Sequence, residues 1–135
     1  MNIDYRTYQQ VCIYLNKIKK AKNTLRKLAH DFSFNEIDED VQLRISIFEK
    51  IEANVLAIFI NHEEQLPYIP LSRCSAITYW YDQKSIDNIK SKDSILQILY
   101  KGDEKFIQDS NLIVRNEKTP ISLKKVFSQF TDTNF

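Results

Sequence analysis

Apolar residues recur at steps of one, three or four along the first part of the chain. This spacing places them on one side of an α-helix, because a helix turns once in about 3.6 residues. The pattern therefore predicts a first helix from near Asp4 to near His30. Its apolar stripe consists of Tyr8, Val11, Cys12, Leu15, Ile18, Ala21, Leu25, Leu28 and Phe32.

A second helix is predicted from Glu36 or Asp40 to Glu64. Its apolar residues fall in two stripes, which is typical of a helix contacted from several sides. The stripes are Ile37, Val41, Ile45, Phe48, Val55 and Phe59, and Leu43, Ile47, Ile51 and Ile58. The segment "VQLRISIF" at 41–48 also alternates as a β-strand would, and this strand is the alternative. No turn signal interrupts the longer helical pattern, so we expect a helix.

Shorter helices are predicted after Pro67, because the residue before a proline disfavours the helical conformation and ends the second helix. One of them starts near Ser72 and covers residues 72–85, including "SRCSAITYWYDQKS". A further helix covers 93–101 and ends before Gly102, which we expect to form a left-handed C-terminal cap.

The last third of the chain is predicted to alternate between helical and extended segments. Residues 103–109 are predicted to form a short helix. Residues 111–116 are predicted to be extended, and the only strand that they could form is an isolated one. Thr119 followed by Pro120 is typical of a helix start, with threonine as the cap. The apolar face of this last helix is Leu123, Val126, Phe127 and Phe130.

Composition supports an all-helical fold. The chain has 135 residues, 1 glycine and 3 prolines. Sheet-rich folds use many glycine-containing turns, and glycine-rich phosphate loops need several glycines, so both classes are excluded. We therefore expect a single all-α domain over 1–135. It is predicted to be a compact helical bundle built on a long antiparallel helix hairpin at 1–66, with three or four shorter helices in 71–130.

Charge is distributed unevenly although the net charge is only +1. Residues 1–30 hold 7 bases and 1 acid (+6), residues 31–66 hold 2 bases and 9 acids (−7), and residues 67–135 hold 10 bases and 8 acids (+2). These three values sum to the net charge of +1. A basic helix lying antiparallel to an acidic one would explain this distribution.

The register of such a hairpin predicts which charges meet. Arg26, Lys27 and His30 should lie beside the acids at 36–40, and the lysines at 17–22 beside the acids at 49–52. The lysines outnumber the acids opposite them, so we expect a basic patch that could face nucleic acid or an acidic protein. Its members are Lys17, Lys19, Lys20 and Lys22.

Residues able to carry catalysis or hold a metal are few. Cys12 and Cys74 lie in apolar surroundings and are expected to be buried. His30 and His62 are far apart, and neither HExxH nor CxxC spacing occurs. Small helical ribonucleases use an arginine followed by a histidine in a late helix, but no histidine follows Arg73. We therefore expect no enzyme activity, no metal and no cofactor.

Three neighbouring aromatic residues mark the helix predicted at 72–85. On that helix Cys74, Ile77 and Tyr81 share the core face, Trp80 lies at its edge and Tyr79 points to solvent. Half-exposed tyrosine and tryptophan are favoured anchors of protein interfaces. Together with Lys84, the residues Tyr79 and Trp80 are therefore the predicted partner-binding residues.

The run Ile77-Thr78-Tyr79-Trp80 also resembles the recognition helix of phage-repressor helix-turn-helix proteins. The long helix before it and the missing glycine after it depart from that pattern. The resemblance implies DNA recognition by the helix at 72–85, which remains an alternative.

The function expected from these observations is that of a small non-enzymatic, cytoplasmic binding protein. It would dock on a macromolecular protein partner, as inhibitors, immunity proteins, antitoxins and phage anti-defence factors do. The alternative is a nucleic-acid-binding regulator that uses the basic N-terminal helix or the helix at 72–85. No apolar run reaches about 18 residues, so no membrane association is expected. A homodimer is compatible with the sequence.

Overall fold

The computed structural model describes residues 5–31, 35–61, 80–82, 92–117, 119 and 121–131. The secondary structure in these ranges is helical, and no strand occurs within them. The predicted all-α class is confirmed for this part of the chain. The helices are α1 (Tyr5–Asp31), α2 (Asn35–Asn61), α3 (Lys92–Arg115) and α4 (Ile121–Thr131). None of these helices is both long enough and apolar enough to cross a membrane.

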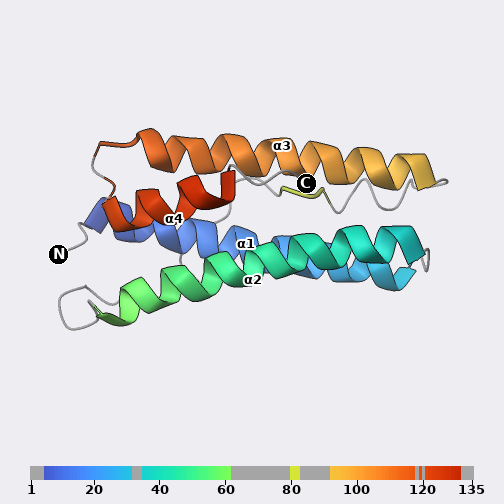
Figure 1. Ribbon diagram of the computed structural model, residues 1–135, viewed down its shortest axis with the longest axis horizontal. Coiled ribbons are helices and arrows are strands. Elements are labelled where there is room, and N and C mark those ends of the chain that lie inside the picture. The colour runs from blue at the N-terminus through green and yellow to red at the C-terminus, as the bar shows by residue number, and fades with distance from the viewer. Residues whose placement is uncertain are drawn as a thin grey trace.

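The four helices form two packed pairs. Helices α1 and α2 lie side by side and run in opposite directions, and the long helix α3 lies on the other side of the molecule (Figure 1). Helix α4 folds back beside α3 and also contacts α2. Direct contact between α2 and α3 is sparse. Side chains from elsewhere in the chain fill the space between these two helices.

Helices α1 and α2 begin and end close to the positions that the apolar pattern predicts. The predicted helix at 41–48 is confirmed, and the strand alternative is wrong. Val41 and Phe48 are both fully buried. They lie seven residues apart, or about two helical turns, so one face of a helix presents both to the core. The predicted residues 62–64 of this helix lie outside the described residues.

Helix α3 corrects three predictions at once. It is continuous over 24 residues, so the helices at 93–101 and 103–109 are one helix, and the isolated strand at 111–116 is wrong. Its buried side is formed at helical spacing by Ile95, Leu99, Phe106 and Ile113. Burial of Ile113 in the core keeps the end of this segment helical, although its β-branched residues favour a strand locally.

Gly102 is part of the helix and does not end it. No residue in the described ranges has a positive φ, so the predicted left-handed cap is wrong. A methyl group at this position would overlap the Tyr81 ring and lie 2.6 Å from the main-chain oxygen of Trp80. The glycine therefore gives an aromatic ring room to lie directly on the backbone of α3.

Helix α4 confirms its predicted apolar face. Leu123, Phe127 and Phe130 are buried and Val126 packs against the same core. The hydroxyl of Thr119 is buried and has no hydrogen-bond partner within the described part of the chain, so the predicted cap hydrogen bond is wrong.

Candidate functional site

The aromatic residues Trp80 and Tyr81 lie at the centre of the structure. Residues 80–82 are not helical, so the predicted helix at 72–85 is wrong at these positions. Only 1% of Trp80 is exposed, so its predicted exposed edge is also wrong, and in this conformation it offers no surface to a partner. Tyr81 is equally buried, which confirms its predicted place in the core. Tyr79 and Lys84 lie outside the described residues.

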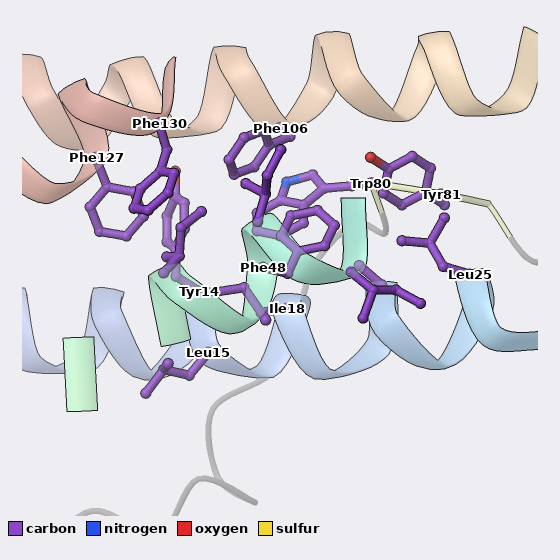
Figure 2. Packing of buried hydrophobic residues seen from close by; sticks show 14 of the residues in the cluster. Tyr14, Leu15, Ile18, Leu25, Phe48, Trp80, Tyr81, Phe106, Phe127 and Phe130 are labelled. Carbon is purple, nitrogen blue, oxygen red and sulfur yellow. The ribbon is translucent and has the colours of Figure 1, made fainter. Parts of the chain in front are cut away.

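The indole ring of Trp80 is enclosed by aromatic rings from three helices. It stacks on Phe48 of α2 with centroids 5.2 Å apart and an interplanar angle of 11°. Phe106 of α3 meets it edge-on at 5.2 Å, and Tyr14 of α1 is tilted toward it at 6.0 Å. Figure 2 shows these rings between the ribbons of α3 and of the α1 and α2 pair. Trp80 thereby joins α3 to the α1 and α2 pair, and α2 and α3 otherwise contact each other little.

Asp109 of α3 anchors the indole through a shared carboxylate oxygen. Trp80 donates from Nε1 to Oδ2 of Asp109 over 2.8 Å, and Lys17 Nζ lies 3.0 Å from the same oxygen. The hydroxyl of Tyr14 donates to the main-chain oxygen of Asp109. This carboxylate therefore links the 80–82 segment to α1 and α3.

Asp103 of α3 anchors Tyr81 in a similar way, deeper in the core. Arg44 of α2 forms a two-pronged pair with it, from Nε to Oδ1 over 2.9 Å and from Nη2 to Oδ2 over 2.7 Å. Tyr81 donates its hydroxyl to Oδ1 over 2.8 Å. Only 2% of Arg44 and 6% of Asp103 are exposed. A buried charge pair of this geometry is satisfied only while both partners are present.

Electrostatics at Arg44 follow from this pairing. Burial on its own would lower the pKa of Arg44. The hydrogen bonds to Asp103 and the charge of that carboxylate outweigh burial and raise the pKa above its ordinary value. Arg44 also donates to the main-chain oxygen of Asp40 over 2.9 Å. The guanidinium is therefore a permanent charge that holds α2 and α3 together.

The predicted basic patch is divided by the fold. Lys17 is buried and pairs with Asp109, and Lys22 pairs with Glu52 of α2 at 3.1 Å. Lys19 is exposed and Lys20 is half-buried. Two of the four lysines are thus held by internal ion pairs.

The charge register of the α1 and α2 pair is partly as predicted. The contact between Lys22 and Glu52 agrees with the predicted register. Arg26 lies 3.6 Å from Glu49. The prediction that Arg26 meets the acids at 36–40 is therefore wrong. Both side chains of that pair are about half exposed, so this contact adds little stability.

Large apolar side chains remain exposed on three helices. Tyr100 and Leu112 of α3 are 57% and 63% exposed, and Ile121 of α4 is 74% exposed. Leu43 and Leu56 of α2 are less exposed. None of these five residues was predicted as a site, because the sequence pattern marked only which side of each helix is apolar.

The described residues hold no group of three or more histidine, cysteine or acidic side chains placed to bind a metal. Asp103 and Asp109 each accept hydrogen bonds from a basic and an aromatic side chain. These two carboxylates can hold neighbouring segments of the chain together, and they can recognise groups that donate hydrogen bonds.

Comparisons with protein-family models, with curated proteins and with solved structures gave no match.

Alkaline pH is expected to destabilise the fold through Tyr14 and Tyr81. Burial, and secondly the charge of Asp109 or Asp103, raises the pKa of each hydroxyl above its ordinary value of 10.0. Above that pH the unfolded chain loses these protons while the folded chain keeps them, so stability falls as pH rises. With two such groups, the free energy of unfolding should fall by about 2.7 kcal/mol per pH unit. Urea denaturation at a series of alkaline pH values measures this slope.

Two variants distinguish the effect of these two hydroxyls on stability from that of other groups that titrate at alkaline pH. A Tyr14→Phe, Tyr81→Phe variant should lose most of the slope, whereas Tyr100→Phe, which changes an exposed ring, should keep it. An unchanged slope in the double variant would contradict the assignment.

Proposed function

We propose that this chain is a non-enzymatic binding protein that docks on a macromolecular protein partner in the cytoplasm. We also propose that the whole chain folds as one helical bundle built on the α1 and α2 hairpin. Inhibitors, immunity proteins, antitoxins and phage anti-defence factors are the types of protein that fit this description. A homodimer is compatible with it.

The observation that carries the docking proposal is the exposure of Tyr100, Leu112 and Ile121. These side chains are 57%, 63% and 74% exposed, while the apolar residues on the inner sides of the same helices are almost completely buried. Contact of large apolar side chains with water is unfavourable, and covering them with a partner lowers the free energy by roughly 25 cal/mol per Å² of apolar surface. Aromatic residues such as Tyr100 are enriched among the residues that dominate interface energies.

One further observation supports recognition over catalysis. The most deeply buried charges, Arg44 and Asp103, are bound to each other and serve to join α2 and α3. Tyr79 and Lys84 remain proposed contact residues, because they flank the buried pair Trp80 and Tyr81 in the sequence. With Trp80 buried, the proposed docking surface is taken from α3 and α4.

The test is capture of a partner from the native host by the tagged full-length chain. A Tyr100→Ala, Leu112→Ala, Ile121→Ala variant should lose at least about tenfold in captured partner, since each truncated anchor costs about 1 kcal/mol or more. The matched control is Leu43→Ala, Leu56→Ala, which removes exposed leucines from α2 and should capture normally. Equal capture by the triple variant and the wild type would reject this surface.

Nucleic-acid binding remains the second proposal because Lys19, Arg26 and Lys27 are exposed on α1. Binding through these side chains would weaken steeply as salt is added. No retention of DNA or RNA by the purified chain at about 50 mM salt would end this alternative.

A further inference from the structure

Helix α3 lies along one edge of the molecule (Figure 1), and its outward side carries a row of exposed side chains. Positions 101, 105, 108, 112 and 115 follow one another at steps of four and three, so they share one face of the helix. We call this face the outer stripe. It is about 21 Å long, because a helix rises about 1.5 Å per residue. Its members, all exposed, are Lys101, Lys105, Gln108, Leu112 and Arg115.

The outer stripe is basic because two acids of α3 face the inside of the molecule. Asp103 pairs there with Arg44, and Asp109 pairs with Lys17. The three bases of the outer stripe have no ion-pair partner among the described residues. Glu104 is the exposed acid beside the stripe. Three bases therefore face solvent with one neighbouring acid, and their charge is available to a partner.

Helix α4, which packs on α3, adds two more bases and no acid. Lys125 is exposed and Lys124 is half-buried, and neither has an ion-pair partner within the described part of the chain. Ile121, the first residue of this helix, is 74% exposed. The α3 and α4 pair therefore presents both unpaired bases and large apolar side chains to solvent.

This combination of charge and apolar surface defines the chemistry of a suitable partner. Unpaired bases favour an acidic partner, because complementary charges speed association and suppress wrong partners. A nucleic-acid backbone would pair with the bases, but its phosphates would leave Leu112 and Ile121 without an apolar contact. An acidic amphipathic helix meets both requirements, because its apolar and acidic residues recur at the same spacing as the residues of the outer stripe.

We infer that the outer stripe of α3 binds an acidic amphipathic helix of the partner protein. Leu112, which is 63% exposed, is the apolar contact, and the three bases of the stripe pair with acids of that helix. This inference rests on the proposed function for the existence of the partner, and it adds the chemistry by which the partner is recognised.

The experiment offers two synthetic peptides to the purified full-length chain. Both have about 20 residues with leucine at helical spacing, and they differ only in carrying glutamate or lysine at the charged positions. We expect the glutamate peptide to bind with a Kd of about 100 μM or tighter, and the lysine peptide to bind at least about tenfold more weakly. Isothermal titration calorimetry measures both at about 0.15 M salt, where charges more than about 8 Å apart are largely screened.

Matched variants locate the binding on the outer stripe. Lys101→Glu, Lys105→Glu should weaken binding of the glutamate peptide at least about tenfold. Lys19→Glu, Lys27→Glu, which reverses exposed bases of α1, should change it less than about twofold. Leu112→Ala should weaken it about fivefold, as expected for truncation of a contact residue. Circular dichroism checks each fold. If the charge reversal unfolds the chain, Lys101→Gln, Lys105→Gln removes the charges and should also weaken binding.

Several outcomes would overturn the inference. One is equal binding of the two peptides, or no binding of the glutamate peptide at about 1 mM. Another is binding of a DNA duplex that Lys101→Glu, Lys105→Glu abolishes and Leu112→Ala leaves unchanged, which would assign the outer stripe to nucleic acid. Self-association in analytical ultracentrifugation that the same charge reversal abolishes would assign the stripe to a second copy of this chain.

Failure of this inference can be distinguished from failure of the proposed function, because the peptides require no host protein. If the glutamate peptide does not bind but a host partner is captured through α3 and α4, the inference is rejected and the proposed function stands. If the glutamate peptide binds the outer stripe but no host partner is captured, the proposed function is rejected and the preference of the stripe for acidic helices stands.

Discussion

Replacing Asp103 with alanine is expected to lower the free energy of unfolding by about 3–5 kcal/mol, since it leaves a buried guanidinium without its counter-charge. Arg44 makes two short contacts with this carboxylate, and its side chain has almost no access to water. Tyr81 loses its acceptor in the same variant. Urea denaturation followed by far-ultraviolet circular dichroism measures the loss.

Two comparisons test whether the charge pair is responsible. Glu104→Ala, at the exposed next position of the same helix, should change stability by no more than about 0.5 kcal/mol. The double variant Arg44→Met, Asp103→Leu should be far less destabilised than the sum of the two single alanine variants, because it leaves no buried charge. Additive losses in the double variant would show that the two side chains do not act as a pair.

The apolar period predicted α1, α2 and α4, because the apolar residues of each recur at helical spacing without a break. The apolar faces of α2 and α3 also contain the signal for the buried charge pair that was missed. Arg44 lies at helical spacing between Val41 and Phe48, both of which are fully buried. Asp103 lies in the same way between Leu99 and Phe106 on α3. A base within one apolar stripe and an acid within another indicate a buried ion pair. Asp103 falls within an apolar stripe only if α3 is interpreted as one continuous helix.

The place of Trp80 and Tyr81 could not be predicted from local pattern. The partners of these residues are 29 and 22 positions away, at Asp109 and Asp103. Tertiary contacts of this kind override the helical spacing of the surrounding residues. Gly102 carried the only local sign, and it was interpreted as a helix end. An interior glycine in a helix is equally a sign that something packs closely on the backbone.

Replacing Trp80 with alanine is expected to lower the free energy of unfolding by about 3–5 kcal/mol, because it removes a large buried ring and leaves a cavity. The cavity would open between Phe48 and Phe106, and so between α2 and α3, which contact each other little elsewhere. Trp80 is the only tryptophan in the chain, so the variant is followed by circular dichroism during urea denaturation.

Trp80→Phe separates the ring from its hydrogen bond. Phenylalanine keeps part of the stack on Phe48 but has no donor for Asp109, so its loss should be smaller, about 1.5–3 kcal/mol. Leu112→Ala, which truncates a side chain that is 63% exposed, should leave stability within about 0.5 kcal/mol of the wild type. If Trp80→Ala cost no more than Leu112→Ala, the indole would not be what holds α3 to the α1 and α2 pair. If the free energy of unfolding increases from Trp80→Ala to Trp80→Phe and again to the wild type, both the ring and the hydrogen bond to Asp109 contribute to stability. Loss of partner capture by the Leu112 variant would then have to come from the interface, since its fold is intact.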